Sequence, residues 1–288
     1  MKALYDVPAP AKLNLFLHVT GRRVDGYHLL QSVFMLIDWC DTLHLELRDD
    51  GKISRHDSGM TLPDDDLVVR AARALQAACG TTAGVHVQLD KRIPVQAGMG
   101  GGSSDAASCL LALNRLWRLG LTLPQLETIG LGLGADVPFF LRGRNAWVEG
   151  VGEQIHAVEL PPGRFAVVKP PPGLDTALIF ADPQLKRDTA PAIISGFAAN
   201  RDGFDPFGFG HNDLQPVAQR LCPAVTQAIQ WLGDQGMQAR MTGSGSAVFA
   251  RMTQEKSLQP APAGWQVREC ANLAVHPLVG WAASDDFG

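Results

Sequence analysis

The segment Val95-Gln96-Ala97-Gly98-Met99-Gly100-Gly101-Gly102-Ser103-Ser104 joins a predicted strand to a predicted helix. Apolar and polar residues alternate over Val85–Leu89, as in a half-buried strand. After the glycines, apolar residues recur at helical spacing as far as Trp117, and Gly120 supplies a helix stop. Glycines let the backbone approach an anion closely, and the free N–H groups of a first helical turn point towards it. The segment therefore predicts a phosphate site.

Two serines strengthen this prediction. Ser103 and Ser104 are expected at the N-cap of the helix, where hydroxyl groups can face a phosphate or its metal ion. The alternative is that the glycine cluster is only a flexible loop. A strand and a strong helix frame it, which disfavours a linker.

Other nucleotide motifs are excluded. The pattern Gly-x-x-x-x-Gly-Lys-Ser/Thr of P-loop NTPases is absent, and no protein-kinase glycine loop precedes a Val-Ala-Ile-Lys. The stretch Gly130-Leu-Gly132-Leu-Gly134-Ala135 resembles a dinucleotide fingerprint. However, Thr122–Ile129 before it is predicted to be a helix, whereas the fingerprint follows a strand.

Composition sets wider limits. The chain has 288 residues, 46% of them hydrophobic and 19% charged, so one large domain or two small ones with a packed core are expected. Its net charge of −4 gives no reason to expect nucleic acid or an anionic membrane as a partner. No apolar run approaches the roughly 20 residues of a membrane span.

The cysteines indicate the compartment. They are odd in number and never spaced as Cys-x-x-Cys, so we expect reduced, mostly buried thiols in a cytoplasmic protein. No signal-peptide hydrophobic stretch follows Met1. The five cysteines are Cys40, Cys79, Cys109, Cys222 and Cys270.

Secondary-structure patterns divide the chain near Glu159–Gly163 and favour an α+β protein of two lobes. Before this seam we predict strands at 12–19, 42–47 and 85–89 and helices at 66–79, 104–119 and 122–130. After it we predict a strand at 164–169, a proline loop at 170–173, helices at 176–186 and 213–233, the latter interrupted by Pro216 and Pro223, strands at 239–241 and 247–252 around a turn, and a surface loop at 251–264.

Three further clusters carry possible chemistry: Pro10–Asn14, Gly134–Pro138 and Thr242–Ser246. Each has an ordinary alternative. Lys12 can be a solvated edge-strand lysine, Asp136 a turn or N-cap aspartate, and the glycines of the last cluster a tight turn.

The order of these clusters resembles the GHMP small-molecule kinases. Pro-Ala-Lys-x-Asn stands near the N-terminus, Gly-x-Gly-Gly-Gly-Ser-Ser in mid-chain, and Gly-Ser-Gly late in the chain. Further stretches extend the resemblance over Pro10 to about His276: Lys12–Val19, Arg23–His28, Gly134–Phe140, Glu149–Glu153 and Asn212–Leu214. Two of them, Asp-Gly-Tyr-His and Ala-Asp-Val-Pro-Phe-Phe, mark the member that phosphorylates a cytidylated methylerythritol on the non-mevalonate route to isoprenoid precursors.

The resemblance implies the fold and the ligands. It implies an N-terminal lobe over residues 1–158, like the second domain of ribosomal protein S5, and a ferredoxin-like C-terminal lobe over residues 159–288. ATP, with Mg²⁺, would meet a substrate carrying cytidine diphosphate in the cleft between the lobes. A monomer or a weak homodimer is expected.

The resemblance also implies roles for individual residues. Asp136 would accept the proton of the attacking hydroxyl, and Lys12 would keep Asp136 ionised and stabilise the transferring phosphoryl group. ATP would be bound by Lys91, Pro94, Val95, Gln96, Ala97, Gly98, Met99, Gly100, Gly101, Gly102, Ser103 and Ser104. The substrate would be bound by Asn14, Tyr27, His28, Thr176, Phe180, Gly243, Ser244 and Gly245. Tyr27 and Phe180 would stack on the pyrimidine, unless Tyr27 is simply a core residue.

Two aspartates stand where asparagine is usual in the family. Asp66 is either a contact of the adenine or only a helix N-cap, because a carboxylate cannot donate the amide hydrogen bond. Asp105 either faces away from the phosphates or meets Mg²⁺, since an anion one turn from the phosphates is otherwise unfavourable.

Two other functions remain open at this point. One is a GHMP kinase for a different small alcohol, which would not need a pyrimidine-stacking aromatic residue. The other is a non-catalytic nucleotide-binding protein on the same fold, which would not need both Lys12 and Asp136.

Overall fold

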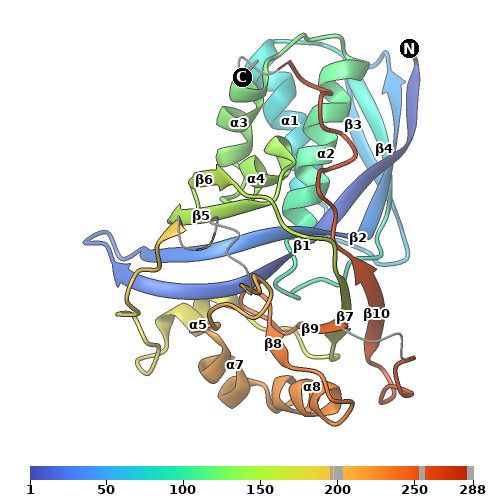
Figure 1. Cartoon of the computed structure of the whole chain (residues 1–288). Coiled ribbons are helices and arrows are strands. Elements are labelled where there is room, and N and C mark those ends of the chain that lie inside the picture. Colours follow the sequence, from blue (N-terminus) through green and yellow to red (C-terminus); the bar gives the residue numbers. More distant parts are fainter. Residues whose placement is uncertain (195–196, 198–203, 253–256, 284–288) are drawn as a thin grey trace.

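The fold consists of two β-sheets with helices on their outer faces (Figure 1). The computed structural model describes residues 1–194, 197, 204–252 and 257–283. Within these residues the predicted α+β class and two-lobed arrangement are confirmed.

The first sheet is built around one long strand, β2. Three other strands pair with it: β1 along its length, β4 at its C-terminal half and β5 at its N-terminal half. The order is β3-β4-β2-β5-β6 with β1 on β2, and every pair is antiparallel except β3–β4. The strands are β1 (Ala3–Arg22), β2 (His28–Arg48), β3 (Ile53–Ser58), β4 (Gly84–Asp90), β5 (Ala146–Gly150) and β6 (Gln154–Ala157).

Strand β1 starts earlier than the predicted strand at 12–19, in spite of Pro8 and Pro10. Because β1 pairs with β2 alone, it is an edge strand, where a missing N–H need not break the ladder. The carbonyls of both prolines are used by the neighbouring helix, since the hydroxyls of Ser108 and Ser104 donate to Pro8 and Pro10 at 2.8 and 2.7 Å.

Strand β2 is also longer than the predicted 42–47, and β3, β5, β6 and the later strand β10 (Gln266–Ala271) were not predicted. Residues Val33–Ile37 of β2 are all buried. A strand covered on both faces has no alternating pattern, so its sequence does not distinguish it from a buried helix.

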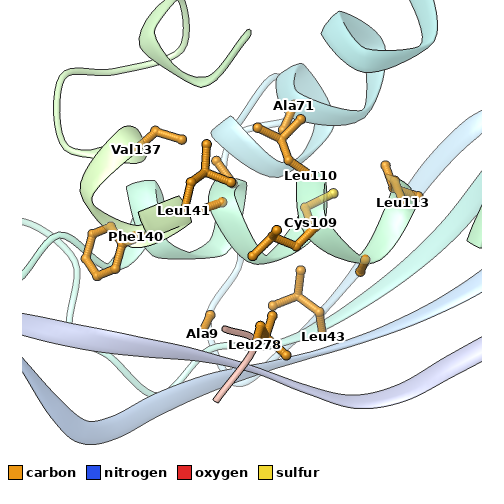
Figure 2. Packing of buried hydrophobic residues seen from close by; sticks show 14 of the residues in the cluster. Ala9, Leu43, Ala71, Cys109, Leu110, Leu113, Val137, Phe140, Leu141 and Leu278 are labelled. Carbon is orange, nitrogen blue, oxygen red and sulfur yellow. The ribbon is translucent and has the colours of Figure 1, made fainter. Parts of the chain in front are cut away.

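Four helices cover one face of the first sheet (Figure 1). Their apolar residues form one core with β1 and β2, and Figure 2 shows Leu110 and Leu141 packed above Ala9 and Leu43. The helices are α1 (Leu67–Cys79), α2 (Gly101–Leu116), α3 (Leu123–Leu131) and α4 (Val137–Arg142). Since α3 is a helix as predicted, the stretch 130–135 is its end and not a dinucleotide fingerprint.

The second sheet belongs to the C-terminal lobe, with the antiparallel order β10-β7-β9-β8. The predicted helix at 176–186 stops at Ala181, because Asp182 precedes Pro183 and is held extended. The helix at 213–233 is split before Pro223, as predicted, but the predicted interruption at Pro216 is wrong. Pro216 lies in the first turn of α7 (Gln215–Leu221), where its missing N–H breaks no helical bond. The elements are β7 (Arg164–Lys169), α5 (Thr176–Ala181), α7 (Gln215–Leu221), α8 (Pro223–Gly233), β8 (Ala239–Met241), β9 (Val248–Met252) and β10 (Gln266–Ala271).

The two lobes share a buried core. Leu13, Met35 and Trp147 of the first sheet belong to the same apolar cluster as Phe165 and Phe249 of the second. This cluster fixes the two sheets against each other.

The last described segment returns to the first lobe, alongside α2 and α3 in Figure 1. The N–H groups of Leu273 and His276 donate to Leu36 and Gly143 at 2.9 and 2.8 Å. Leu278 is buried in the helix-covered core, and Trp281 packs against it. The chain therefore crosses between the lobes more than once.

All five cysteines are free thiols, and Cys109, Cys222 and Cys270 are buried, in line with the expectation of reduced, mostly buried thiols. Within the described residues, no helix has both the length and the apolar character needed to cross a membrane.

Replacing Leu278 with alanine should lower the free energy of unfolding by about 2–5 kcal/mol, because a buried leucine leaves a cavity. Val279→Ala is the matched control, since Val279 is 41% exposed, and it should stay within about 0.5 kcal/mol of the parent protein. Urea denaturation measures both. Equal effects of the two substitutions would mean that the returning segment is not part of the first lobe's core.

Candidate active site

A cavity of about 870 Å³ lies between the lobes. It collects residues from β1, the glycine loop, the start of α4, α5 and the β8–β9 turn. The predicted site residues that line it are Lys12, Asn14, Lys91, residues 94–103, Asp136, Thr176, Phe180, Gly243, Ser244 and Gly245. Tyr27 and His28 line a neighbouring hollow of about 520 Å³.

The glycine loop leads directly into α2. Gly100, not a serine, is the N-cap, with φ +69°, so Ser103 and Ser104 lie in the first helical turn instead of at the predicted cap. A side chain at Gly100 would come within 2.9 Å of Phe140. The first described intrahelical bond is from Ser104 to Gly100 O at 2.9 Å, which leaves the preceding N–H groups available at the cavity.

Ser104 is the one predicted ATP contact that does not line the cavity. Its side chain is fully buried, and its hydroxyl donates to Pro10 O. The prediction of Ser104 as a phosphate-facing hydroxyl is corrected here: the residue ties α2 to β1, whereas Ser103 lines the cavity.

The glycine loop is docked on the β8–β9 turn of the other lobe. The N–H groups of Ser246 and Ala247 each donate to the loop, to Gln96 O and Ala97 O, at 3.2 Å. A Cβ atom at Gly98 would lie 2.3 Å from Thr242 O, and Gly98 has φ +72°. Only glycine fits this position, because backbone atoms occupy the space of a side chain.

Lys12 and Asp136 line the same cavity as these two loops. Lys12 Nζ is 3.8 Å from Asp136 Oδ2 and 4.5 Å from the centre of the Phe34 ring. Burial lowers the pKa of Lys12, and the carboxylate of Asp136 opposes this shift. The Asp136 side chain is 31% exposed and caps no N–H of α4, so it is available to a ligand.

Asn14 connects this pair to the second lobe. Its Oδ1 accepts from Lys12 Nζ, and its Nδ2 donates to Ser32 Oγ at 2.8 Å. Its backbone N–H donates to Thr242 Oγ1 at 2.8 Å. The amide is therefore oriented on both sides, which fixes the position of the lysine ammonium.

Lys91 is buried between two carboxylates. Its Nζ donates to Asp105 Oδ2 at 2.6 Å and to Asp41 Oδ2. Asp41 Oδ1 also accepts the N–H groups of Arg92 and Ile93. Burial alone would lower the pKa of Lys91, but the two carboxylates raise it above its ordinary value. Lys91 therefore lines the cavity as a charged group already paired with two carboxylates.

This cluster explains the unusual Asp105. Burial raises the pKa of Asp105 well above its ordinary value, and the neighbouring Asp41 raises it further against the effect of Lys91. The sequence left two alternatives for Asp105, namely that it faces away from the phosphates or that it meets Mg²⁺. Neither describes it fully, because Asp105 lines the cavity but one of its carboxylate oxygens accepts from Lys91.

Asp66 is the N-cap of α1 and accepts from Val69 N at 3.1 Å. The guanidinium of Arg55 also donates to it. The capping role is confirmed. Asp66 lines the cavity as well, so a contact with adenine stays a prediction.

The smaller hollow contains the aromatic residues expected at the pyrimidine. Tyr27 is 66% exposed at the β1–β2 turn and is not a core residue. The rings of His28 and Phe180 are stacked, with centroids 5.0 Å apart and planes at 29°. Phe180 lines both hollows, so the two adjoin each other at this side chain.

The proline loop before α5 is held by a buried lysine. Lys169 Nζ donates to Pro170 O and Pro172 O at 2.7 and 3.0 Å. Thr176 at the start of α5 hydrogen-bonds Ser244 at 2.6 Å, which joins α5 to the glycine turn.

Sequence reasoning missed two supporting residues, Asp41 and Ser32, and it named Thr242 only as the first residue of the glycine turn. The signal for Asp41 was a carboxylate within the apolar run that follows Val33, because such a carboxylate must find a buried partner. Ser32 gave no signal, since short hydroxyl residues are common in strands.

Replacing Gly98 with alanine should destabilise the protein by about 1–3 kcal/mol more than Gly80→Ala. Both positions have positive φ, but an added Cβ meets backbone atoms at Gly98 and nothing within 4 Å at Gly80. Urea denaturation of the two variants makes the comparison. If Gly80→Ala were equally destabilising, the close approach of the two loops would not matter.

Comparison with known proteins agrees with this architecture. Two domain descriptions match the chain: "GHMP kinases N terminal domain" over residues 66–144 and "GHMP kinases C terminal" over residues 202–265. A solved homoserine kinase from Cytophaga hutchinsonii, 16% identical, has a TM-score of 0.68 over 96% of both chains, which shows a shared fold.

More similar proteins carry one name. The 4-diphosphocytidyl-2-C-methyl-D-erythritol kinase of Variovorax paradoxus is 68% identical over 98% of this chain and 100% of its own length. That of Albidiferax ferrireducens is 70% identical over 99% of this chain and 98% of its own. A crystal structure of a 4-(cytidine 5'-diphospho)-2C-methyl-D-erythritol kinase, 36% identical, has a TM-score of 0.72 over 87% of this chain and 90% of that one. The chain therefore belongs to the 4-diphosphocytidyl-2-C-methyl-D-erythritol kinase family of the GHMP kinases.

Proposed function

We propose that the protein transfers the γ-phosphoryl group of ATP to the 2-hydroxyl of 4-diphosphocytidyl-2-C-methyl-D-erythritol, on the non-mevalonate route to isoprenoid precursors. A single observation carries this proposal: Lys12 Nζ and Asp136 Oδ2 lie 3.8 Å apart in the cavity that the glycine loop lines. The aromatic hollow adjoins this cavity. The names of the full-length relatives identify the substrate.

Phosphoryl transfer depends on positioning and on stabilising charge more than on covalent catalysis. Asp136 can orient the attacking hydroxyl and accept its proton, because its carboxylate is partly exposed in the cavity. Lys12, which has no second carboxylate within 4.0 Å among the described residues, supplies a positive charge beside the transferring group. The N–H groups at the start of α2 would hold the phosphates of ATP.

Mg²⁺ is part of the proposal, and the residues present fit it. Mg²⁺ usually takes one or two carboxylates together with substrate phosphates, so it needs no cage of protein ligands. Ser103 and Asp136 offer oxygen atoms at the cavity. No group of three or more metal-ligating His, Cys, Asp or Glu side chains occurs in the described part of the chain, which fits an ion brought in with the nucleotide. The ion would neutralise phosphate charge.

The second hollow supports a cytidine substrate. Tyr27 and Phe180 are more than 150 positions apart in the sequence but line one hollow, and both present aromatic faces on which a pyrimidine can stack. Asn14, Thr176 and the turn Gly243–Gly245 line the larger cavity together with the glycine loop, and the rest of the substrate would lie there.

The aromatic hollow and the Lys12–Asp136 pair each disfavour one of the two other functions. A kinase for a smaller alcohol would have no use for the aromatic side chains, and a non-catalytic protein would have no use for the Lys12–Asp136 pair. Release of ADP, measured with the cytidylated alcohol, with a smaller alcohol such as homoserine or mevalonate, and with no alcohol, distinguishes all three. Turnover only with the cytidylated alcohol is the expected result.

The finer expectations on organisation stand as proposals. A boundary between residues 158 and 159 is supported by the end of β6 at Ala157 and the start of β7, in the other sheet, at Arg164. The segment 273–281 packs with the first lobe, so the last part of the proposed C-terminal domain would contribute to the core of the N-terminal domain. The net charge supports the proposal that nucleic acid is not a partner, and the cysteine pattern supports a cytoplasmic protein. A monomer or weak homodimer stays a proposal that rests on the resemblance.

Asp136→Ala should lower the turnover number by about 10²–10⁴-fold, because the proton acceptor and hydroxyl-orienting group is lost. ATP binding should survive, since the glycine loop is intact. ADP release measures turnover, and calorimetry measures the affinity for ATP. Activity within about tenfold of the parent enzyme would end the assignment of Asp136.

Tyr27→Ala should raise the KM for the cytidine substrate by the equivalent of about 1–3 kcal/mol, the usual value of stacking on one base. The KM for ATP should stay nearly unchanged. Tyr5→Ala is the control, because Tyr5, the other tyrosine, is 59% exposed on β1 and lines neither hollow. A parallel rise in both KM values would indicate a structural role for Tyr27 instead.

A further inference from the structure

Arg187, which follows α5, hydrogen-bonds two residues that line the aromatic hollow, His28 and Phe180. Its Nε donates to His28 Nε2 at 2.9 Å, and its Nη2 donates to the carbonyls of Phe180 and Asp182, each at 2.9 Å. Its Nη1 donates to Leu185 O at 3.0 Å. No carboxylate lies within 4.0 Å of this guanidinium in the described part of the chain, so all of its recorded partners are neutral acceptors.

The bond to His28 fixes the chemistry of the imidazole. Arginine only donates, so Nε2 of His28 must accept and cannot carry a proton. A neutral imidazole has one N–H, which must therefore be on Nδ1. Among the described residues, Nδ1 has no hydrogen-bond partner. It is also not a fully buried atom, so solvent can reach it. His28 lines the hollow, so this N–H is the donor that its ring can offer to a ligand there.

The same guanidinium positions the stacking surface. Phe180 is held through its carbonyl by Arg187, and its ring is stacked on the ring of His28. One side chain therefore fixes both the aromatic face and the hydrogen-bonding edge beside it. Cytosine offers two adjacent acceptors, N3 and O2, to such a donor.

We infer that Arg187 is a positioning residue for substrate recognition, which fixes His28 as the Nδ1–H tautomer so that His28 donates to the pyrimidine of the substrate. The identity of the ligand rests on the proposed function, whereas the tautomer does not depend on it.

The surroundings of His28 also favour the neutral imidazole. Burial, Arg187 and Arg22 all lower the pKa of His28. A lowered pKa means that the imidazole stays neutral through the neutral pH range and is protonated only in more acidic solution. Protonation would place a proton on Nε2 and break the bond from Arg187.

The simpler alternative is that Arg187 only fastens the end of α5. Arg220 provides a matched control, because its Nη2 binds both carboxylate oxygens of Asp182 at 2.9 Å and so fastens the same segment without a recorded contact with His28. Arg187→Met and Arg220→Met keep much of the side-chain length and remove the donors. Arg187→Lys keeps the charge but not the planar set of donors.

Nitrogen-15 NMR of histidine-labelled protein tests the tautomer directly. The parent protein should show His28 protonated on Nδ1, with a titration midpoint below about 6.5, the ordinary histidine value. Arg187→Met should lose this single tautomer and titrate at higher pH, and Arg220→Met should resemble the parent. A parent His28 protonated on Nε2 would overturn the inference.

Kinetics at pH 8, where His28 is neutral in every variant, test the consequence. Arg187→Met should raise the KM for the cytidine substrate roughly three- to tenfold, as expected for one hydrogen bond, with the KM for ATP and kcat unchanged. Arg187→Lys should be intermediate, and Arg220→Met should have no effect. Equal rises in Arg187→Met and Arg220→Met, or an equal rise in the KM for ATP, would overturn the inference. If the parent enzyme did not phosphorylate the substrate at all, the proposed function would fail while the NMR result stood on its own.

Discussion

The active-site cleft depends on the close approach of two backbones, at Gly98 of the first lobe and at Thr242 and Gly243 of the second. A side chain at Gly98 would meet Thr242 O at 2.3 Å, and one at Gly243 would meet Gly98 O at 2.7 Å. This contact sets the distance between the loop that would hold phosphate and the turn that would meet the substrate. The shared core behind it, with Trp147 and Phe165, keeps the sheets in the orientation that the contact requires.

Two buried lysines near this junction differ in pKa because their surroundings differ. Lys91 is bound by Asp41 and Asp105, and the two carboxylates raise its pKa. Lys12 is bound by the neutral amide of Asn14 and lies near Asp136, and burial lowers its pKa. The charge of Lys91 is already neutralised, so Lys91 anchors the strand before the loop. The charge of Lys12 remains available to a reacting phosphoryl group.

The substrate side of the cleft is assembled from loops that rigid neighbours hold in place. Lys169 gathers the carbonyls of the proline loop, and Thr176 joins α5 to the turn at Ser244. Arg187 joins the end of α5 to the start of β2. Polar groups on irregular backbone need such partners because water is displaced from them. The aromatic faces are therefore presented by segments with little regular structure of their own.

The sequence alone determined the helix after the glycine loop, the split before Pro223 and the family, because prolines and glycine motifs act over a few neighbouring residues. It offered the N-cap as one of two roles for Asp66, and the structure confirmed the cap. Glycine and charge patterns also indicated Lys12 and Asp136. The partners of these residues were not accessible in this way. Buried strands such as β2 lose their alternation when both faces are covered, and contacts such as Lys91 with Asp41 join residues 50 positions apart. Only tertiary structure decided that Ser104 faces β1, because a helix's rotation about its axis is set by what it packs against.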